Sequence, residues 1–397
     1  MIELGNPQIK YHDGQAILEN DIVINGKKQI IWFKVDEEYG KYLCDERNDA
    51  YLIACLNYAM RNNHDIVSRA PITEDLLYNI ETYLIPALIE NNPSFHRVKI
   101  SAEVSSDVLP SGGAVGTGIS CGVDSLNALA NHTDSKFHNY NITHLTFNNV
   151  GSHGEGDRAR KLYLSRIERS REFAKKYGFK FVAGDSNLMD IIEQSHFKTH
   201  TYSSMFPVYC LQKLYSCYLY ASGGYRFNEF ELRDLPNLCC GSYELLSLNV
   251  FSTPQIQIKS EGMGITRLNK LRNVIKYEPS HRYLNVCLQE GDNCGVCEKC
   301  VRTLLGLDSL NSLDLYKEVF DINYYRDNKK WYLQQMMYRI KDKKHDYLEM
   351  YPFFKNEISP IMRLKAEVYV LKVALFKFIR ANTFLYNVAK RVKGKNA

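Results

Sequence analysis

The sequence predicts an α/β protein: a doubly wound parallel sheet with a four-cysteine metal element, an N-terminal α+β domain and a helical C-terminal extension. Two observations predict this class. Between residues 106 and 310, strand-like segments alternate with segments of helical composition, which is typical of parallel sheets with helical crossovers. Four cysteines with the spacing of metal ligands lie near the end of this stretch. We therefore expect domains at residues 1–105, 106–310 and 311–397.

The first domain begins with a predicted β-hairpin. Residues 16–24 and 29–35 are apolar, strand-like runs, and the Asn25-Gly26 pair between them is a strong turn signal. Nothing in this domain has catalytic spacing. We expect a cap or dimerisation domain, and a homodimer is therefore one prediction. The alternative is that the domain holds the part of the substrate that does not react.

Helical segments follow the hairpin. Residues 45–62 carry apolar side chains at helical spacing. Thr73 suits the N-cap of a second helix, and Pro86 predicts a kink or break within it. Residues 97–104 alternate like a strand and lead into the central domain.

The central domain is organised around residues 118–126, which read GISCGVDSL. The preceding residues 114–120 suit a buried strand end, and the following LNALANH has helical composition. A strand, a tight turn of small residues and a helix together form an anion site, because turn amides and the helix N-terminus point at the ligand. Ser120 and Ser125 add hydroxyl donors, and Asp124 can hold a divalent cation that bridges phosphates.

The run S-C-G-V-D-S at residues 120–125 resembles the S-G-G-x-D-S signature of the PP-loop ATP pyrophosphatases, with Cys121 in place of the first glycine. The resemblance implies that the chain binds ATP with Mg²⁺, transfers AMP to a carbonyl oxygen of its substrate and releases pyrophosphate. It assigns catalytic roles to Asp124 and Ser125. The ATP ligands that it implies in this loop are Ser120, Cys121, Gly122, Val123, Asp124 and Ser125.

Further strands and helices are expected after the loop. They are a strand at 143–150, a charged helix at 157–177 that ends at Gly178, a strand at 180–183, a buried helix at 206–220 and a core strand at 238–241. The carboxyl ends of parallel strands meet at one edge of a sheet, where ligands bind. Four segments should therefore converge there: 120–125, 148–151, 184–187 and 241–243.

The resemblance extends the ATP site along this edge. It places adenine and ribose at the end of the second strand, at Phe147, Asn148 and Asn149, and we add Gly241 at the end of the fourth. It also implies a basic residue that meets the phosphates, for which Arg267 and Lys270 are the candidates. A solvated basic helix face is the alternative for these two residues. His196 and His200 are four residues apart, and they either contact the substrate or lie at the surface.

The four clustered cysteines are Cys287, Cys294, Cys297 and Cys300, in a C-x6-C-x2-C-x2-C pattern. Four thiolates at this spacing suit tetrahedral Zn²⁺ in a closed structural site. An iron–sulfur cluster uses the same ligands and stays open. The chain has 11 cysteines, and an odd number without an export signal argues against a disulfide framework.

A PP-loop domain followed by these cysteines resembles 7-cyano-7-deazaguanine synthase and its relatives. The resemblance covers roughly residues 110–310, and it implies that zinc lies near the active site. Residues 241–254 lack the Asp-rich substrate motif of that family. We therefore expect a divergent relative that applies the same ATP chemistry to another substrate.

These features predict an ATP-dependent C–N ligase. A substrate carboxylate or carbonyl oxygen takes AMP, and ammonia or an amine then displaces it. Positioning and charge stabilisation carry such chemistry, so no protein nucleophile is needed. The expected acceptor is a small molecule, a glycan or a protein terminus.

Two other functions stay open. An enzyme that thiolates tRNA or a base would use a catalytic cysteine, for which Cys239, Cys240 and Cys121 are candidates. A non-catalytic sensor or scaffold would bind ATP without turnover. The formal net charge of +5 is low for a nucleic-acid-binding protein, so RNA is the lesser of the expected partners.

The ends of the sequence bear on localisation. Residues 1–10 do not read as a signal peptide, and no uncharged apolar run reaches the roughly 18 residues that span a bilayer. We expect a cytoplasmic protein. Residues 368–379 are apolar, and basic residues gather around and after them, so a basic helix at a membrane surface is one prediction and a solvated tail is the other. The basic residues are Lys372, Lys377, Arg380, Lys390, Arg391, Lys393 and Lys395.

Overall fold

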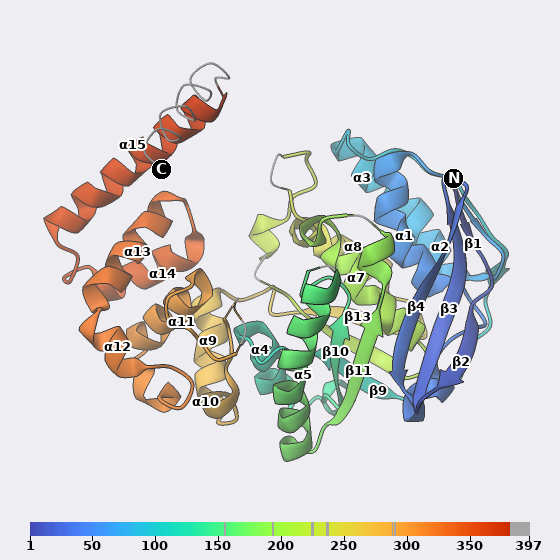
Figure 1. The fold of residues 1–397 in the computed structure, drawn as a ribbon, viewed down its shortest axis with the longest axis horizontal. Coiled ribbons are helices and arrows are strands. Elements are labelled where there is room, and N and C mark those ends of the chain that lie inside the picture. The colour runs from blue at the N-terminus through green and yellow to red at the C-terminus, as the bar shows by residue number, and fades with distance from the viewer. Residues whose placement is uncertain are drawn as a thin grey trace. The chain divides into compact units, whose positions relative to one another are not determined.

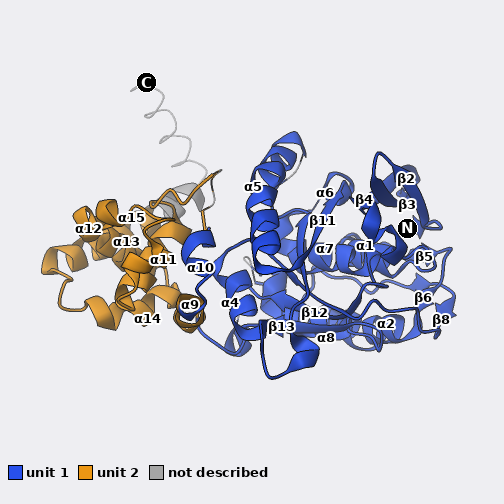
Figure 2. Ribbon diagram, turned by 90° about the horizontal axis from the view of Figure 1, so that it is seen from below, with its two compact units in different colours: residues 1–266, 276–285 blue, residues 267–275, 286–397 orange. Residues whose placement is uncertain are grey.

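The computed structural model of the chain describes residues 1–154, 156–192, 194–223, 226–235, 238–287, 289 and 291–381, and the side chains of 376–381 are left out. The basic residues from Lys390 to Lys395 thus lie outside the described part. Two compact units are present: residues 1–266 with 276–285, and residues 267–275 with the chain from 286 on (Figure 2). This division differs from the boundaries expected near residues 105 and 310.

The first unit is built on one mixed, mostly parallel sheet, confirming the α/β class (Figure 1). Within the described residues, eleven strands form it in the order β13-β12-β9-β10-β11-β4-β3-β1-β5-β7, with β2 paired to β3. The strands are β1 (Ile2–Leu4), β2 (Gln8–His12), β3 (Gln15–Ile24), β4 (Lys27–Asp36), β5 (Ile66–Ser68), β7 (Ile100–Ser101), β9 (Ala114–Gly118), β10 (His144–Asn149), β11 (Lys180–Ser186), β12 (Tyr215–Ala221) and β13 (Gln257–Glu261).

The N-terminal strands continue the sheet of the central domain. Strands β13, β12, β9, β10 and β11 run parallel to one another. At the end of this parallel part, β4 pairs antiparallel with β11 through Asp185↔Lys34 and Ser186↔Phe33. The N-terminal hairpin therefore shares a sheet with the strands that carry the loop at 118–126.

The hairpin between β3 and β4 is confirmed. Its turn residues Asn25 and Gly26 both have positive φ, at 53° and 77°. Such a turn matches the right-handed twist of the flanking strands, and asparagine followed by glycine is the pair that tolerates it best. The ten register pairs run from Gln15↔Asp36 to Ile24↔Lys27.

Helices cover both faces of the parallel part of the sheet. Along β11, Phe181 and Ala183 pack on the cluster beneath α5 (Gly156–Tyr177), whereas Val182 between them belongs to the main core. Successive strand residues point to opposite faces, so the sheet is buried on both sides. Helix α4 (Val123–His132) packs on β9 and β12, and α7 (His196–Cys210) packs on α1 (Asp49–Asn62).

Two expected elements of this region are wrong. Residues 206–220 do not form one helix, because α7 ends at Cys210 and β12 starts at Tyr215. Residues 238–241 are not a strand, because the 3-10 helix η5 (Cys240–Tyr243) begins there. A short apolar run suits a buried strand and a buried helix equally well, and the tyrosines of residues 215–221 favour the strand.

The remaining elements of the first unit are short. Thr73 precedes α2 (Glu74–Asn79) as expected, but its hydroxyl donates to Asp49 instead of capping the helix. A π-helical turn, η2 (Ile80–Leu84), interrupts the helix just before Pro86. The other elements are β6 (Ile72–Thr73), β8 (Val104–Ser105), α2 (Glu74–Asn79), α3 (Ile85–Asn91), α6 (Leu188–Ile191), α8 (Glu244–Val250), α10 (Ser280–Tyr283) and the 3-10 turns η1 (Glu37–Tyr42), η3 (His138–Tyr140) and η4 (Phe227–Glu229).

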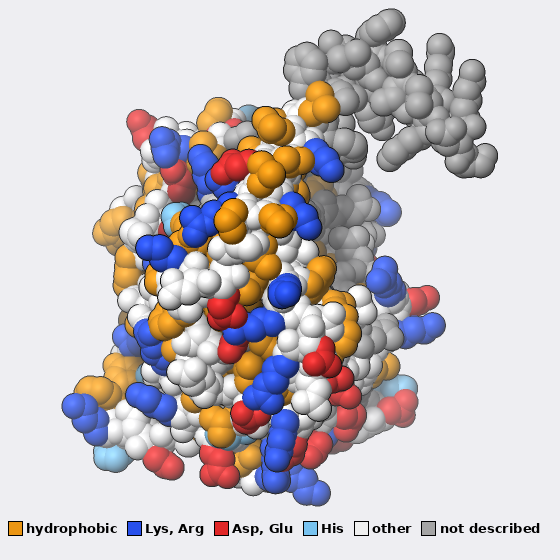
Figure 3. All heavy atoms as spheres, turned by 90° about the vertical axis from the view of Figure 1, so that its left-hand side faces the viewer, with side chains coloured by type: hydrophobic (Ala, Val, Ile, Leu, Met, Phe, Trp, Pro, Cys, Tyr) orange, Lys and Arg blue, Asp and Glu red, His pale blue; other side chains and the backbone are white. Residues whose placement is uncertain are grey.

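The second unit is helical where it is described. Its core is rich in tyrosines, and Tyr325 and Tyr332 are fully buried with ring centroids 4.6 Å apart. Basic and acidic side chains are interspersed with apolar groups on the face drawn in Figure 3. The helices are α9 (Arg267–Lys276), α11 (Glu298–Ser309), α12 (Ile322–Asp327), α13 (Lys329–Lys341), α14 (His345–Phe354) and α15 (Pro360–Ala381), with the 3-10 turn η6 (Leu313–Tyr316).

Helix α15 exposes apolar side chains at helical spacing. Ile361, Leu364, Leu371 and Leu375 each expose more than half of their surface. The expected membrane-surface role of this region stays a prediction. None of the helices in the described part of the chain is both long and apolar enough to cross a bilayer.

Candidate functional site

The loop at 118–126 joins the carboxyl end of a central parallel strand to a helix. Strand β9 ends at Gly118 between β12 and β10, and α4 begins at Val123. Gly116 is required in β9, because a Cβ there would lie 2.5 Å from the Tyr215 ring. The loop therefore occupies the position where ligands bind in open α/β sheets.

Cys121 occupies the tightest point of this turn. Its φ is +55°, in the left-handed region that favours glycine. The side chain is fully buried, and burial raises the pKa of its thiol to about 12. Its carbonyl oxygen accepts a 2.8 Å hydrogen bond from the Asn285 amide. The backbone is thus held in the form that the glycine of the S-G-G-x-D-S signature allows, and the neutral thiol is unsuited to catalysis.

The two serine hydroxyls lie against the loop backbone. Ser125 Oγ donates to the Gly122 carbonyl at 3.1 Å, and the Gly122 amide donates to Ser120 Oγ at 3.3 Å. The two Oγ atoms are 3.5 Å apart. Asp124 is half-buried in the first turn of α4. The structure therefore brings the predicted loop residues Ser120–Ser125 together around one turn.

The predicted ligands at the end of β10 point in different directions. Phe147 is buried against Tyr163 of α5, with ring centroids 5.5 Å apart. Asn148 lies against Gly184, and its Oδ1 is buried without a hydrogen-bond partner among the described residues. Asn149 donates to Asp185 Oδ1 at 2.9 Å. The strand therefore offers one core residue and two polar residues.

Asp185, at the end of β11, forms ion pairs with two basic side chains. Its Oδ2 lies 2.5 Å from Arg160 Nη2 and 3.5 Å from Lys34 Nζ. The segment expected at 184–187 thus reaches the same edge as the loop and the end of β10. Each strand pair concerned is parallel and in register, so this convergence of three strand ends is confirmed.

Gly241 does not end a strand, contrary to the prediction. It lies in η5, and its amide donates to Cys239 Sγ at 3.4 Å. The same sulfur lies 3.2 Å from Nε2 of His200 on α7. His200 and Cys239 are both candidates from the sequence. Their contact is not predictable from it, because 39 residues separate them along the chain.

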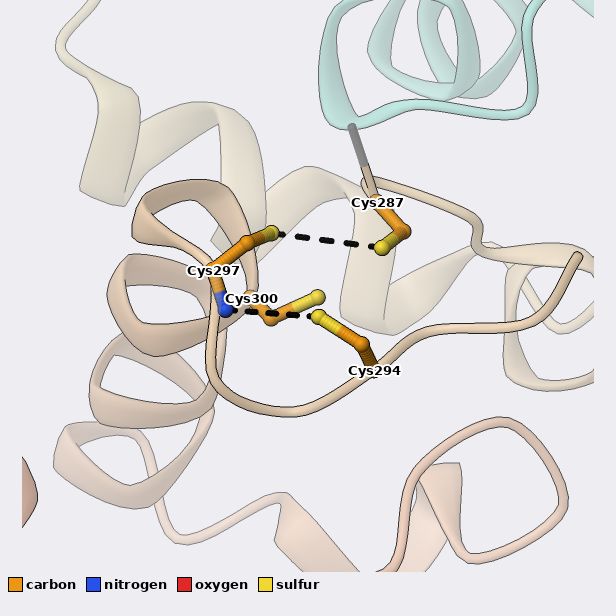
Figure 4. Close-up of side chains that lie close together, drawn as sticks. All are labelled: Cys287, Cys294, Cys297 and Cys300. Carbon is orange, nitrogen blue, oxygen red and sulfur yellow. Dashed lines mark hydrogen bonds between the residues drawn. The ribbon is translucent and has the colours of Figure 1, made fainter. Parts of the chain in front are cut away.

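The four predicted metal ligands come together in the second unit (Figure 4). The four Sγ atoms lie within 4.8 Å of one another, and those of Cys287 and Cys297 are 4.0 Å apart. A tetrahedron with zinc–sulfur bonds of about 2.3 Å has sulfur–sulfur edges of about 3.8 Å. The cluster is therefore compatible with a zinc site.

Polar contacts hold the cysteine loop in shape. Gly295 has a φ of +75°, and its carbonyl accepts a 3.0 Å hydrogen bond from Tyr332 Oη. Asn293 accepts from the Val286 amide at 2.8 Å and donates to the Val319 carbonyl at 3.0 Å. Such outer contacts orient ligands around a metal ion.

The predicted phosphate ligands Arg267 and Lys270 lie on α9 in the second unit. Lys270 is buried, with 1% of its surface exposed. A solvated helix face, the alternative offered for these residues, does not describe Lys270. Their predicted role toward phosphates stays a prediction.

The comparisons with known proteins add no relative. No protein-family model, curated protein sequence or solved structure matches this chain significantly. Any function must therefore be inferred from the site itself.

Proposed function

We propose that the chain is an ATP-dependent adenylating enzyme of the PP-loop type. One observation carries the proposal: the S-C-G-V-D-S run forms the turn between the parallel strand β9 and helix α4, with Cys121 left-handed at the position of the signature's first glycine. Turn amides and a helix N-terminus at the carboxyl edge of a parallel sheet suit the phosphates of a nucleotide.

The loop supplies donors for a triphosphate. The Gly122 and Val123 amides begin α4, and the Ser120 and Ser125 hydroxyls now hydrogen-bond within the loop. Phosphate oxygens would exchange for these internal partners, so binding needs a local rearrangement of hydroxyl rotamers. Asp124 would hold Mg²⁺, which when bound neutralises phosphate charge.

The chemistry then follows from positioning. A carbonyl or carboxylate oxygen of the acceptor attacks the α-phosphorus, the bond to the β-phosphate oxygen breaks, and pyrophosphate leaves. Loop donors stabilise the charge that develops on the leaving group. Ammonia or an amine then attacks the acyl carbon, and AMP departs with the electron pair.

The cysteine cluster suits a structural part in this enzyme. All four ligands come from the protein, so Cys287, Cys294, Cys297 and Cys300 would close the coordination of Zn²⁺, which when bound fixes the 287–300 segment. The thiolation of a base is the second candidate function, and the Cys239–His200 contact favours it.

The experiment is to identify the nucleotide product. Protein is incubated with Mg²⁺ and ATP labelled at the α-phosphate, with and without cell extract as the acceptor source. We expect labelled AMP with equimolar pyrophosphate, lost by about 100-fold or more in Asp124→Ala. Asp157→Ala is the matched control, because Asp157 lies in the first turn of another helix, α5. ADP as the product, or tight ATP binding without turnover, would contradict the proposal, and the second result would favour a sensor.

A further inference from the structure

Three side chains from separate segments form a line of hydrogen bonds in the first unit. Tyr220 Oη of β12 lies 3.1 Å from His200 Nδ1, and His200 Nε2 lies 3.2 Å from Cys239 Sγ. Both ring nitrogens of the histidine are therefore occupied, which fixes the orientation of the ring. This is the arrangement of a nucleophile, a base and a group that orients the base.

The line lies at the ligand-binding edge of the sheet. Tyr220 follows Leu219, which pairs with Thr117 one residue before β9 ends at Gly118. One turn before His200 on α7, His196 abuts Gly151 just beyond β10, where an added Cβ would lie 2.9 Å from His196 Nδ1. The cysteine–histidine pair and the 118–126 loop thus lie at the same carboxyl edge.

Cys239 Sγ is surrounded by donors. His200 Nε2 and the Gly241 amide lie within hydrogen-bonding distance of it. The neighbouring Cys240 thiol, then His200 and the Gly241 amide, lower the pKa of the Cys239 thiol. Burial of Cys239 acts against this lowering. At Cys44, Cys55 and Cys121, burial is the main effect and raises the pKa of the thiol to about 12. The thiolate is the reactive form of cysteine.

The environment of Cys240 does not suit a nucleophile. Its Sγ accepts hydrogen bonds from the Thr201 amide and hydroxyl, each at 3.5 Å. Burial raises the pKa of its thiol. The raised pKa keeps Cys240 protonated, so only one of the two adjacent cysteines has nucleophilic character.

We propose that Cys239 is a nucleophile, activated by His200, that takes an acyl group from an activated carboxyl substrate as a thioester. Tyr220 is a positioning residue. This proposal rests on the proposed function, because the acyl adenylate formed in the adenylation step is the electrophile that Cys239 would attack. A cysteine thiolate next to an imidazole is suited to attack an acyl carbon.

Cys239 gives its proton to His200, the sulfur attacks the acyl carbon, a C–S bond forms, and the C–O bond to AMP breaks. AMP leaves with the electron pair. Attack by the amine then forms the C–N bond and breaks the C–S bond, the amine's proton passes to solvent, and the thiolate is restored.

The test uses p-nitrophenyl acetate on the full chain without ATP, with peptide-resolved mass spectrometry to locate the acetyl group. We expect a burst of about one p-nitrophenolate per chain and acetylation of Cys239 at pH 6. Cys239→Ser should lose both. His200→Gln should lower the burst rate by about 100-fold at pH 6, because it removes the imidazole that accepts the thiol proton.

Cys240→Ser is the discriminating variant. Serine keeps a small polar hydroxyl at residue 240 beside Cys239, so we expect acetylation within about threefold of the unaltered chain. The same His200, Cys239 and Cys240 ligand atoms lie within 4.8 Å, which a bound metal ion would also need. A metal ion or a Cys239–Cys240 disulfide would block acetylation of Cys239 in the unaltered chain, and Cys240→Ser would release it. No acetylation of the unaltered chain together with acetylation of Cys239 in Cys240→Ser therefore overturns the proposal.

The two proposals fail separately. If AMP and pyrophosphate form but Cys239 is never acetylated, the nucleophile is wrong and the adenylation stands. If Cys239 is acetylated but ATP gives no AMP, the thiol is a nucleophile and the adenylation is wrong. Equal acetylation of several cysteines in the folded chain would also overturn the assignment of Cys239.

Discussion

The imidazole of His200 lies between two side chains, with Nε2 3.2 Å from Cys239 Sγ and Nδ1 3.1 Å from Tyr220 Oη. Helix α7 supplies the histidine, β12 the tyrosine and the segment before η5 the cysteine. Because β12 lies next to β9, the contact links the cysteine to the strand that carries the 118–126 loop.

The Tyr220 hydroxyl should be needed to hold the imidazole. Tyr220→Phe removes the partner of Nδ1, so we expect acetylation of Cys239 to slow by about three- to tenfold, with the pH profile shifted toward higher pH. Tyr218→Phe is the matched control, because Tyr218 is another buried tyrosine of β12 whose Oη lies 2.9 Å from Thr146 Oγ1 instead. Equal slowing in both variants would assign Tyr220 a merely structural role.

The first unit should lose stability in mild acid. Burial lowers the pKa of His153 and of His196 to about 4, whereas an exposed histidine titrates near 6.5. Between these values the unfolded chain binds more protons, so stability falls as pH drops from about 6.5 to about 4, by about 3 kcal/mol for each residue.

Urea unfolding at pH 7 and pH 5 measures this effect. His196→Gln cannot take up a proton, so its stability should depend less on pH than that of the unaltered chain, whatever the change in absolute stability. The exposed His138 provides the control variant, His138→Gln. An unchanged pH dependence in His196→Gln would show that this buried imidazole does not resist protonation.

Because the backbone at Cys121 is left-handed, the glycine variant should be more stable than the alanine variant, the reverse of the usual order in a helix. A left-handed residue with a Cβ costs about 1–2 kcal/mol, so Cys121→Gly should be more stable than Cys121→Ala by about 1 kcal/mol. At the exposed helical residue Lys175, the alanine variant should be the more stable by about 1 kcal/mol. If Cys121→Ala equals or exceeds Cys121→Gly, the loop does not have the signature's geometry.

The four-cysteine cluster should hold one metal ion per chain. We expect about one zinc per purified chain, lost in Cys294→Ser and in Cys300→Ser, since each removes one of four ligands. Cys55→Ser is the control, because Cys55 is fully buried in α1 of the first unit. Metal content is measured by mass spectrometry. Bound iron with absorbance near 400 nm would identify the cofactor as an iron–sulfur cluster instead of zinc. A folded chain without metal would contradict the metal site.

Structures that depend on a few neighbouring residues are predictable from the sequence. Asn25-Gly26 predicts the hairpin turn because few residue pairs accept two positive φ values. The spacing of Cys294, Cys297 and Cys300 predicts their meeting because a short loop confines them. The sequence predicts residues 118–126 as a turn between a strand and a helix for a similar reason: small residues between an apolar run and a helical one leave few other structures.

Long-range relationships could not be read in this way. The pairing of β4 with β11 joins residues about 150 positions apart, and no local signal marks Lys34 as the partner of Asp185. The apolar run at 206–220 divides between α7 and β12 because tertiary packing, not local periodicity, decides its structure. The contact between His200 and Cys239 depends on both arrangements.

The central claim is that the 118–126 loop binds the phosphates of ATP, and amide hydrogen exchange tests it most directly. Mg²⁺-ATP should slow exchange in peptides covering residues 118–126, and Asp124→Ala should remove that protection while Asp157→Ala keeps it. Protection confined to other segments, or none in this loop at saturating ATP, would contradict the account.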